Sequence, residues 1–443
     1  MRPPERPLAS TATFTRDWLV RQRWFRAKRR LVATVVEADR ASLGGGAWLL
    51  VLAVRYADGG EDRYLVPAIE DDARWREPRD GDGAWRAIVR LISEGAEIPA
   101  RAGRFRFAAT PALAGLLPPV ARAGEGLEER RLAVEQTNTS VVLSDRLILK
   151  VYRLLEGGEN PDLEVSAFLT EVGFAATPAL AGAGHFVPVD GAAPLATAML
   201  QAFVPSRGDA WAYMLGCLAT DLEAATTAAA RIGEVTSALH RALASRPEHP
   251  SFPARPATVE EAAAWRAGAE RELADAEASL SGAQRERLVR LAPPIRAMFA
   301  DAFGSASASA PVTRIHGDYH LGQLLVTVEG GFMVIDFEGE PARPLVERRR
   351  PSSPLRDVAG MLRSLDYAAR TAERGARATG FHVDSWLAAA RSAFLNAYDA
   401  TSPDEGLLRA FELEKACYEV RYEANNRPAW IWLPLEALER LAR

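Results

Sequence analysis

The sequence predicts an α+β protein with a strand-rich first half and a largely helical second half. Short runs with the period-two alternation typical of strands recur up to residue 203. From residue 210 onward, apolar residues recur at helical spacing over long segments. A stretch rich in Pro, Gly and Ala at 109–125 separates the strand-rich half into two parts. The predicted regions are a cap at 1–110, a small mixed α/β lobe at 111–204 and a helical lobe at 205–443.

Each region contains recognisable elements. In the first region we expect a helix over 17–25, strands over 31–36, 47–56 and 63–69, and a helix over 84–93. In the second, strands over 145–152 and 196–203 flank a helix that opens at Asn160-Pro161, where Asn is a suitable N-cap and Pro a suitable first residue. Six amphipathic helices are expected in the third region, over 210–244, 259–280, 283–303, 355–371, 384–398 and 407–425.

A segment with the residues needed for phosphoryl transfer interrupts the helices of the third region. His316-Gly317-Asp318 is followed five residues later by Gln323, and Asp336-Phe337 comes after two strand-like runs joined by a Gly-Gly turn. Such chemistry needs a carboxylate that receives a hydroxyl proton, plus oxygen ligands for a divalent ion. Asp318 fits the first role, and Gln323 and Asp336 fit the second. A loop and hairpin with incidental carboxylates is the alternative, and the coincidence of three features argues against it.

Lys150 lies in an otherwise apolar strand-like run and therefore needs an anion nearby. Glu164 and Glu171 on the following helix are both possible partners, and we favour Glu164, at the start of the helix. The alternative is an edge-strand lysine with two solvated glutamates. The polar residues just before this strand, Thr137, Asn138, Thr139 and Ser140, are expected to offer donors to phosphate, although a plain hairpin turn explains them equally well.

At this point the chain resembles bacterial maltokinases, which belong to the larger aminoglycoside-phosphotransferase-like group of kinases. The segments that carry the resemblance are 135–152, 201–211, 314–339, 347–367 and 418–430. The resemblance implies a bilobal protein-kinase-like fold with an N-terminal cap. It also implies ATP-dependent phosphorylation of the anomeric hydroxyl of maltose, giving maltose 1-phosphate for α-glucan synthesis, and a possible partner that interconverts trehalose and maltose.

The resemblance assigns roles to residues. It implies that Asp318 is the catalytic base, that Gln323 and Asp336 bind Mg²⁺, and that Lys150 holds the phosphates of ATP. In kinase-like folds the hinge backbone binds adenine, which would place Gln201, Ala202 and Phe203 beside the base. Asp357 follows the metal carboxylate at a distance where related phosphotransferases keep an aspartate that steadies the catalytic-loop histidine, so we expect it to orient His316. An ordinary carboxylate at a helix N-terminus is the alternative.

Sugar specificity is expected on the last long helix. Helical spacing places tyrosines, carboxylates, an amide and an arginine together there, and aromatic rings stack on sugars while charged groups bind hydroxyls in pairs. The expected sugar-binding residues are Tyr418, Glu419, Tyr422, Glu423, Asn426 and Arg427, together with Asp209. The alternative is that the charged residues form surface pairs and the tyrosines pack into the core.

Composition excludes several classes of function. With 54 basic and 58 acidic residues, the net charge of −4 gives no basic field for nucleic acid. No apolar run reaches the length of a membrane span, and the start lacks the apolar core of a secretory signal. Two cysteines in so long a chain predict reduced thiols, and we expect a cytoplasmic enzyme. A glucosamine kinase or other sugar kinase of the same fold, or a non-catalytic kinase-like binding module, remains an alternative function.

Overall fold

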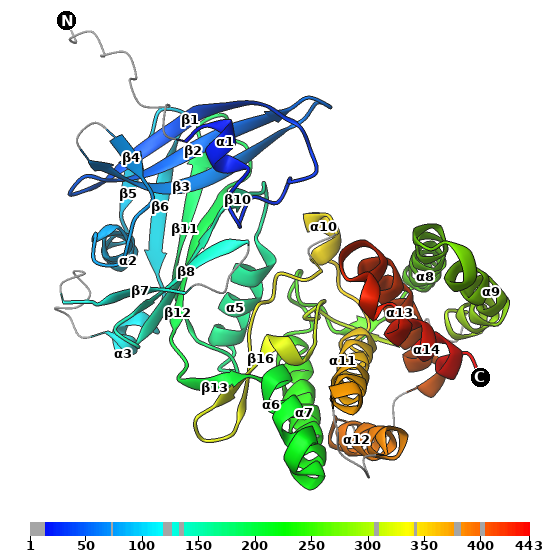
Figure 1. Ribbon diagram of the computed structural model, residues 1–443. Helices are drawn as coiled ribbons and strands as arrows, with labels where there is room; N and C mark the ends of the chain where they lie inside the picture. The colour runs from blue at the N-terminus through cyan, green and yellow to red at the C-terminus, as the bar shows by residue number, and fades with distance from the viewer. Residues whose placement is uncertain are drawn as a thin grey trace, which may run out of the picture. The chain divides into compact units, whose positions relative to one another are not determined.

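The computed structural model describes residues 14–71, 74–117, 126–132, 137–304, 310–340, 343–375, 382–398 and 404–443. The chain forms two compact units (Figure 1). The first contains Met1–Thr170 and Pro178–Pro205, and the second contains Glu171–Thr177 and Ser206–Arg443. The first unit is built around β-sheets and the second is mostly helical, which confirms the predicted α+β class.

A strongly twisted antiparallel sheet forms the start of the first unit. Its order is β1-β2-β3-β10, and β4 also pairs with β3. The strand bounds are β1 Val32–Gly44, β2 Ala47–Tyr56, β3 Glu61–Asp71, β4 Arg74–Arg76 and β10 Leu154–Leu155. Gly44, Gly45 and Gly46 all have positive φ at the β1–β2 turn, a conformation that glycine adopts without steric cost. The predicted helix over 17–25 is much shorter, since α1 covers only Arg16–Leu19.

The second sheet of this unit has seven strands in the order β5-β6-β11-β12-β9-β8-β7. Their bounds are β5 Glu97–Pro99, β6 Gly103–Ala109, β7 Glu129–Arg131, β8 Asn138–Leu143, β9 Leu147–Tyr152, β11 Leu180–Pro188 and β12 Leu195–Ala202. The helices are α2 Ala84–Glu94, α3 Leu113–Leu116 and α5 Pro161–Glu171. The sheets do not divide at the expected boundary after residue 110, because β6 pairs with β11 while β10 pairs back to β3.

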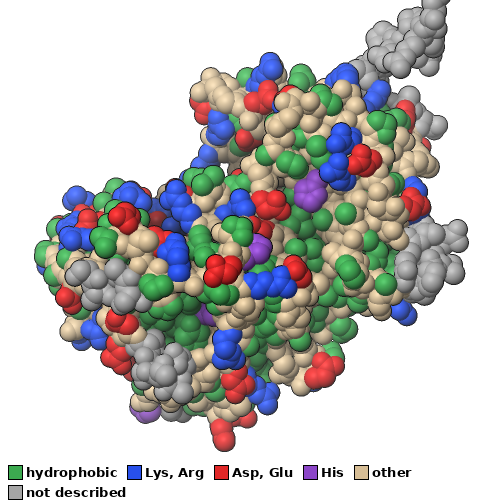
Figure 2. All heavy atoms as spheres, turned by 180° about the vertical axis from the view of Figure 1, so that it is seen from behind, with side chains coloured by type: hydrophobic (Ala, Val, Ile, Leu, Met, Phe, Trp, Pro, Cys, Tyr) green, Lys and Arg blue, Asp and Glu red, His purple; other side chains and the backbone are tan. Residues whose placement is uncertain are grey.

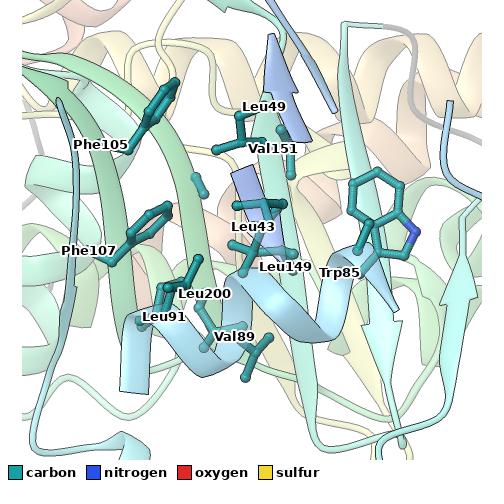
Figure 3. Close-up of a cluster of buried hydrophobic side chains, with 14 of the residues drawn as sticks. Leu43, Leu49, Trp85, Val89, Leu91, Phe105, Phe107, Leu149, Val151 and Leu200 are labelled. Carbon is teal, nitrogen blue, oxygen red and sulfur yellow. The ribbon is translucent and has the colours of Figure 1, made fainter. Parts of the chain in front are cut away.

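One hydrophobic core joins the two sheets of the first unit. Helix α2 places Trp85 and Val89, both fully buried, against strands of both sheets (Figure 3). Strand β2 is buried on both faces: Leu49 and Val51 belong to this core, while Leu50 and Leu52 belong to a second core on the other face. Period-two alternation accounts for that division. The shared core explains why the predicted cap and the following lobe form a single compact unit.

The second unit consists mainly of helices, most of them where the sequence predicts them. Their bounds are α6 Ala210–Thr220, α7 Leu222–Leu243, α8 Val259–Ser279, α9 Gly282–Ala302, α10 Leu345–Arg348, α11 Leu355–Gly375, α12 Val383–Tyr398, α13 Glu405–Asn426 and α14 Trp432–Leu441, with short 3₁₀ turns η2 Leu321–Gln323 and η3 Pro428–Trp430. The single helix predicted over 210–244 is broken at Asp221, where the backbone is extended (φ −154°). The Asp221 side chain caps α7, because its Oδ1 accepts a hydrogen bond from Ala224 N at 2.9 Å.

Short strands accompany these helices. The order β13-β16-β17 makes one sheet and β14-β15 another. The bounds are β13 Ser206–Asp209, β14 Arg255–Pro256, β15 Pro311–Val312, β16 Leu324–Thr327 and β17 Phe332–Val334. Strands β16 and β17 form the hairpin predicted from the sequence, with Leu324 opposite Val334.

On the face of the molecule shown in Figure 2, acidic and basic side chains are interspersed, and neither kind covers a continuous area. This distribution agrees with the small net charge of −4. Among the helices that the structure describes, none is both long and apolar enough to cross a lipid bilayer.

Candidate active site

The candidate active site of the second unit is centred on the loop between β15 and η2. In this loop the His316 imidazole donates from Nε2 to the carbonyl oxygen of Ile335 at 3.0 Å, and its Nδ1 accepts from the amide of Asp318 at 3.4 Å. The His316 ring also packs against Phe337, with ring centroids 5.0 Å apart. One buried histidine therefore holds the loop that carries Asp318 against the segment that carries Asp336.

Asp357 fixes the same loop, though through the backbone rather than through the imidazole. Its carboxylate accepts from the amides of His316 at 2.7 Å and Gly317 at 2.9 Å. His240 Nε2 donates to it at 3.1 Å, and the hydroxyl of Tyr398 lies 2.9 Å from the other nitrogen of that ring. Asp357 therefore contacts His316 through the backbone amide, and its expected role in orienting His316 stays a prediction.

Asp318 lies beside Lys415, a residue that is not among those predicted from the sequence. Lys415 Nζ lies 3.4 Å from Asp318 Oδ1, and the two side chains are 26% and 21% exposed. Burial acts to raise the pKa of Asp318, but Lys415, His320 and His316 together outweigh burial, so this pKa lies below its ordinary value. Burial likewise acts to lower the pKa of Lys415, and Asp318 and Glu340 raise it overall. The pair is therefore ionised at neutral pH.

Gln323 and Asp336 meet at the base of the β16–β17 hairpin, as their spacing predicts. Gln323 Nε2 lies 3.4 Å from Asp336 Oδ2, and carboxylate oxygens of Asp336 and Glu338 lie within 4.8 Å of each other. Asp336 has a φ of +66°, one of three positive values among the described non-glycine residues. Such strain is typical of functional positions. The oxygens of two carboxylates and an amide fit Mg²⁺, which binds hard oxygen ligands.

A cavity of about 500 Å³ opens next to Asp318 within the second unit. Helix α13 contributes Glu414, Lys415 and Tyr418 to its wall, and α8 contributes Trp265 and Glu272. The Lys415 ammonium lies 4.5 Å from the centre of the Tyr418 ring. The volume lies within the range of small-molecule sites.

Of the expected sugar-binding residues, only Tyr418 lines this cavity. Glu419 accepts from Arg363 at 2.7 Å. Glu423 accepts from Arg427 at 2.6 Å, the i,i+4 pair that the alternative interpretation describes. Tyr422 stacks against Tyr418 and is 42% exposed. Asn426 Nδ2 donates to the carbonyl oxygen of Tyr422 at 2.9 Å, and Asp209 caps α6 by accepting from Ala212 N at 2.8 Å.

In the first unit, Lys150 forms an ion pair with a carboxylate other than the expected one. Its Nζ lies 2.9 Å from Asp162 Oδ2, and the Asp162 side chain is only 1% exposed. Asn160 Oδ1 caps α5 by accepting from the amide of Asp162 at 2.9 Å, which fixes this first turn beside β9. Glu164, the partner expected from the sequence, lies two residues later and is half-buried. Spacing along the chain alone did not identify which first-turn carboxylate faces the strand.

The residues expected to form a phosphate-binding loop lie largely in a strand. Asn138, Thr139 and Ser140 begin β8 and are 7%, 2% and 1% exposed, and Ser140 lies opposite Lys150. Thr139 Oγ1 accepts from Arg153 Nε at 2.8 Å. These three residues therefore lie in a strand rather than in a loop, and their expected contact with phosphate stays a prediction. Thr137, which precedes the strand, is half-buried.

The expected adenine-binding segment ends strand β12. The amide of Ala202 donates to the carbonyl oxygen of Ala179 at 2.9 Å, and that of Phe203 to Arg146 at 2.8 Å. Gln201 Nε2 donates to Ser166 Oγ at 3.2 Å. Both amides thus donate within the first unit, and the role of the segment stays a prediction.

Comparisons with known proteins agree with this geometry. The profile of the phosphotransferase enzyme family matches residues 120–394, and that of the maltokinase N-terminal cap domain matches residues 18–85. The glucosamine kinase of Streptacidiphilus jiangxiensis is 32% identical over 400 residues, 86% of either chain. That of Mycolicibacterium smegmatis is 28% identical over 423 residues, 92% of this chain and 98% of the relative.

A solved structure of a glucosamine kinase in complex with glucosamine, ADP and inorganic phosphate has a TM-score of 0.75 and 27% identity, with complete coverage of both chains. The resemblance to maltokinases is thus supported for the cap domain, whereas the full-length relatives found are named glucosamine kinases. Taken with the Asp318, Gln323 and Asp336 geometry, these matches show that the chain belongs to the phosphotransferase enzyme family and is a phosphotransferase with the kinase-like fold.

Proposed function

We propose that the protein is an ATP-dependent sugar kinase whose acceptor is glucosamine. The observation that carries the proposal is the Asp318–Lys415 pair, which presents an ionised carboxylate to a cavity large enough for a sugar. The acceptor is inferred from the two relatives named glucosamine kinases and from the solved glucosamine complex. This inference replaces maltose as the first choice.

In the proposed reaction, Asp318 accepts the proton of the acceptor hydroxyl as its oxygen attacks the terminal phosphorus of ATP. A new phosphorus–oxygen bond to the sugar forms, and the bond to the ADP oxygen breaks. Lys415 stabilises the carboxylate before the transfer, and Asp357 holds the loop in place through the amides of His316 and Gly317. Most of the rate enhancement would then come from positioning and electrostatics.

Gln323 and Asp336 would hold Mg²⁺, and Glu338 would complete the set of oxygen ligands. When bound, the ion would neutralise charge on the phosphate oxygens. The strained backbone of Asp336 and the hydrogen bond to Gln323 fix both side chains at the base of one hairpin.

The first unit would supply the contacts to ATP. Lys150, held by Asp162, is the proposed ligand of the inner phosphates, and Gln201, Ala202 and Phe203 are proposed to lie beside adenine. The remaining predicted contacts, Glu164 and Thr137, stay secondary candidates. Sugar contacts from Glu419, Glu423, Asn426 and Arg427 would require the observed intramolecular bonds to rearrange.

A second candidate acceptor is maltose, giving maltose 1-phosphate. The match of residues 18–85 to the maltokinase N-terminal cap domain favours it. In that case an enzyme that supplies maltose from trehalose would be the expected partner.

A coupled assay of ADP formation with glucosamine, glucose, maltose and trehalose separates these candidates. We expect turnover with glucosamine. Phosphorylation of maltose but not glucosamine would reverse the order of the two candidates. Asp318→Asn should abolish turnover with either sugar while ATP binding, measured by calorimetry, stays close to that of the wild type. Retained turnover in this variant would refute the assignment of the base.

A further inference from the structure

We propose that Glu340 and Glu414 form an acceptor-binding subsite in the Asp318 cavity, where they receive hydrogen bonds from sugar groups other than the reacting hydroxyl. This inference rests on the proposed sugar kinase function and names the part of the cavity that would select the acceptor. Neither glutamate belongs to the predicted catalytic or sugar-binding residues.

Among the described residues, one carboxylate oxygen of Glu340 has a hydrogen-bond partner and the other has none. The residue is 7% exposed and lies just after the Asp336 segment. Its Oε2 accepts from Arg343 Nε at 2.6 Å. Its Oε1 is buried, receives no hydrogen bond from any residue that the structure describes, and belongs to a residue that lines the cavity.

Glu414 repeats this arrangement from a different element. It lies on α13 directly before Lys415 and is 3% exposed. Its Oε1 accepts from Arg356 at 3.0 Å and lies 3.8 Å from Arg343. Its Oε2 is buried and has no hydrogen-bond donor within the described part of the chain, and the residue lines the same cavity.

Two buried carboxylate oxygens without donors are unusual, because leaving a buried polar atom unsatisfied is costly. Arg343 and Arg356 already compensate the negative charges, so what the two oxygens need is a donor. The hydroxyl and ammonium groups of a sugar are O–H and N–H donors of this kind. The ligand class is therefore a carbohydrate that reaches beyond Asp318 into the wall formed by Glu340 and Glu414.

Substitution by glutamine tests this subsite sharply. In Glu414→Gln one side-chain oxygen is replaced by an NH₂ group of nearly the same size. The NH₂ group can take the position of either carboxylate oxygen. In one orientation it faces Arg356, and in the other it faces the sugar, so one of these two donors loses its acceptor. The same reasoning applies to Glu340→Gln and Arg343.

Glu412→Gln is the matched control. Glu412 lies on the same helix, is 4% exposed, accepts from Arg391 at 2.8 Å and also has an unpartnered buried oxygen. It lines a different cavity, which does not include Asp318. The control therefore reproduces the loss of a buried carboxylate without changing the proposed subsite.

Steady-state kinetics with glucosamine, glucose and maltose, with ATP varied separately, give the main readout. We expect Glu340→Gln and Glu414→Gln to raise the acceptor KM about tenfold or more, the effect of one lost charge-assisted hydrogen bond. The KM for ATP and kcat should stay within about twofold of the wild type, as should all parameters of Glu412→Gln. A higher KM for all acceptors would indicate that the two glutamates bind hydroxyl groups. A higher KM for glucosamine alone would indicate that they bind its ammonium group.

An acceptor KM in both variants equal to that of Glu412→Gln would overturn the proposal. If a glutamine variant fails to fold, Glu414→Asp, which keeps the charge but shortens the reach, is tested in the same way. The proposed kinase function fails differently, since the wild type would then phosphorylate none of the sugars. Calorimetric titration of the wild type and Glu414→Gln with each sugar would still test the subsite, because equal affinities would refute it.

Discussion

Asp357→Asn is predicted to damage both the stability of the helical unit and catalysis. The Asp357 side chain is 1% exposed and accepts three hydrogen bonds, two from the backbone amides of His316 and Gly317 and one from His240. Asparagine has a similar size but only one acceptor oxygen. Its NH₂ group would face one of these donors, so at least one hydrogen bond is lost and the remaining ones lose their charge assistance.

The expected loss of unfolding free energy is about 2–5 kcal/mol, since a hydrogen bond to a buried charged group contributes roughly 1.5–3 kcal/mol. A loop displaced by about 1 Å reduces turnover by roughly a hundredfold, because in-line attack requires the base and the hydroxyl to be aligned. We therefore expect kcat in Asp357→Asn to fall ~10–100-fold, while the KM for ATP changes little.

Asp39→Asn is the control for this experiment. Asp39 is 2% exposed and accepts from the amides of Arg40, Arg101 and Ala102, each at 2.8 Å. Its replacement should lower stability in a similar way without reducing kcat. Urea unfolding and steady-state kinetics of both variants provide the comparison. Equal kcat in Asp357→Asn and Asp39→Asn would show that Asp357 does not position the loop.

The pH dependence adds a second check on Asp357. Burial acts to raise the pKa of Asp357, but the hydrogen bond from His240 and the electrostatic interactions with His240 and His316 lower this pKa overall. A carboxyl with a depressed folded-state pKa stabilises the protein above its ordinary pKa, and this contribution is lost as pH falls through the folded-state value. The stability difference between wild type and Asp357→Asn should therefore be largest near neutral pH and narrow on acidification. A constant difference at all pH values would contradict the assignment.

Two further substitutions test contacts in the two units. Lys415→Met removes a positive charge that lowers the pKa of Asp318, while the effect of burial, which raises this pKa, remains. The acid limb of the kcat/KM–pH profile should therefore move to higher pH. An unchanged acid limb would exclude Asp318 as the titrating base. Glu77→Gln leaves the buried Arg153 guanidinium without the carboxylate that lies 2.6 Å away. We expect the unfolding free energy of the first unit to fall by about 2–4 kcal/mol, which is at the low end for breaking a buried ion pair because Glu77 is 19% exposed. A urea midpoint equal to that of the wild type would refute this prediction.

The sequence singles out the proposed reacting groups because they are close along the chain. Asp318, Gln323 and Asp336 lie on one loop and one hairpin, and local turn and strand signals suffice to bring the last two together. Helix bounds were predicted well where capping residues and apolar periodicity coincide. Asp221 shows the limit, since its capping role divides a segment whose periodicity alone favours one helix.

Other parts of the site depend on contacts that no local pattern encodes. Asp162 and Glu164 lie in the same first turn, and only the angle between α5 and β9 decides that Asp162 meets Lys150. Lys415 is an ordinary helix residue in the sequence, and it becomes part of the site because α13 packs beside the loop of Asp318. A lysine three residues before Tyr418, on the same helical face, was the one signal available for it.

This difference between local and distant contacts bears on how acceptors are selected. The groups proposed for proton transfer and metal binding come from one short stretch of chain, so relatives with different acceptors can retain them together. The cavity wall is assembled from α8, the segment after Asp336, and α13, which are far apart in the sequence. A substitution at Glu340 or Glu414 can therefore alter the acceptor without disturbing Asp318 directly. Acceptor choice is accordingly better tested at the cavity wall than at the catalytic motif, which sugar kinases with different acceptors would share.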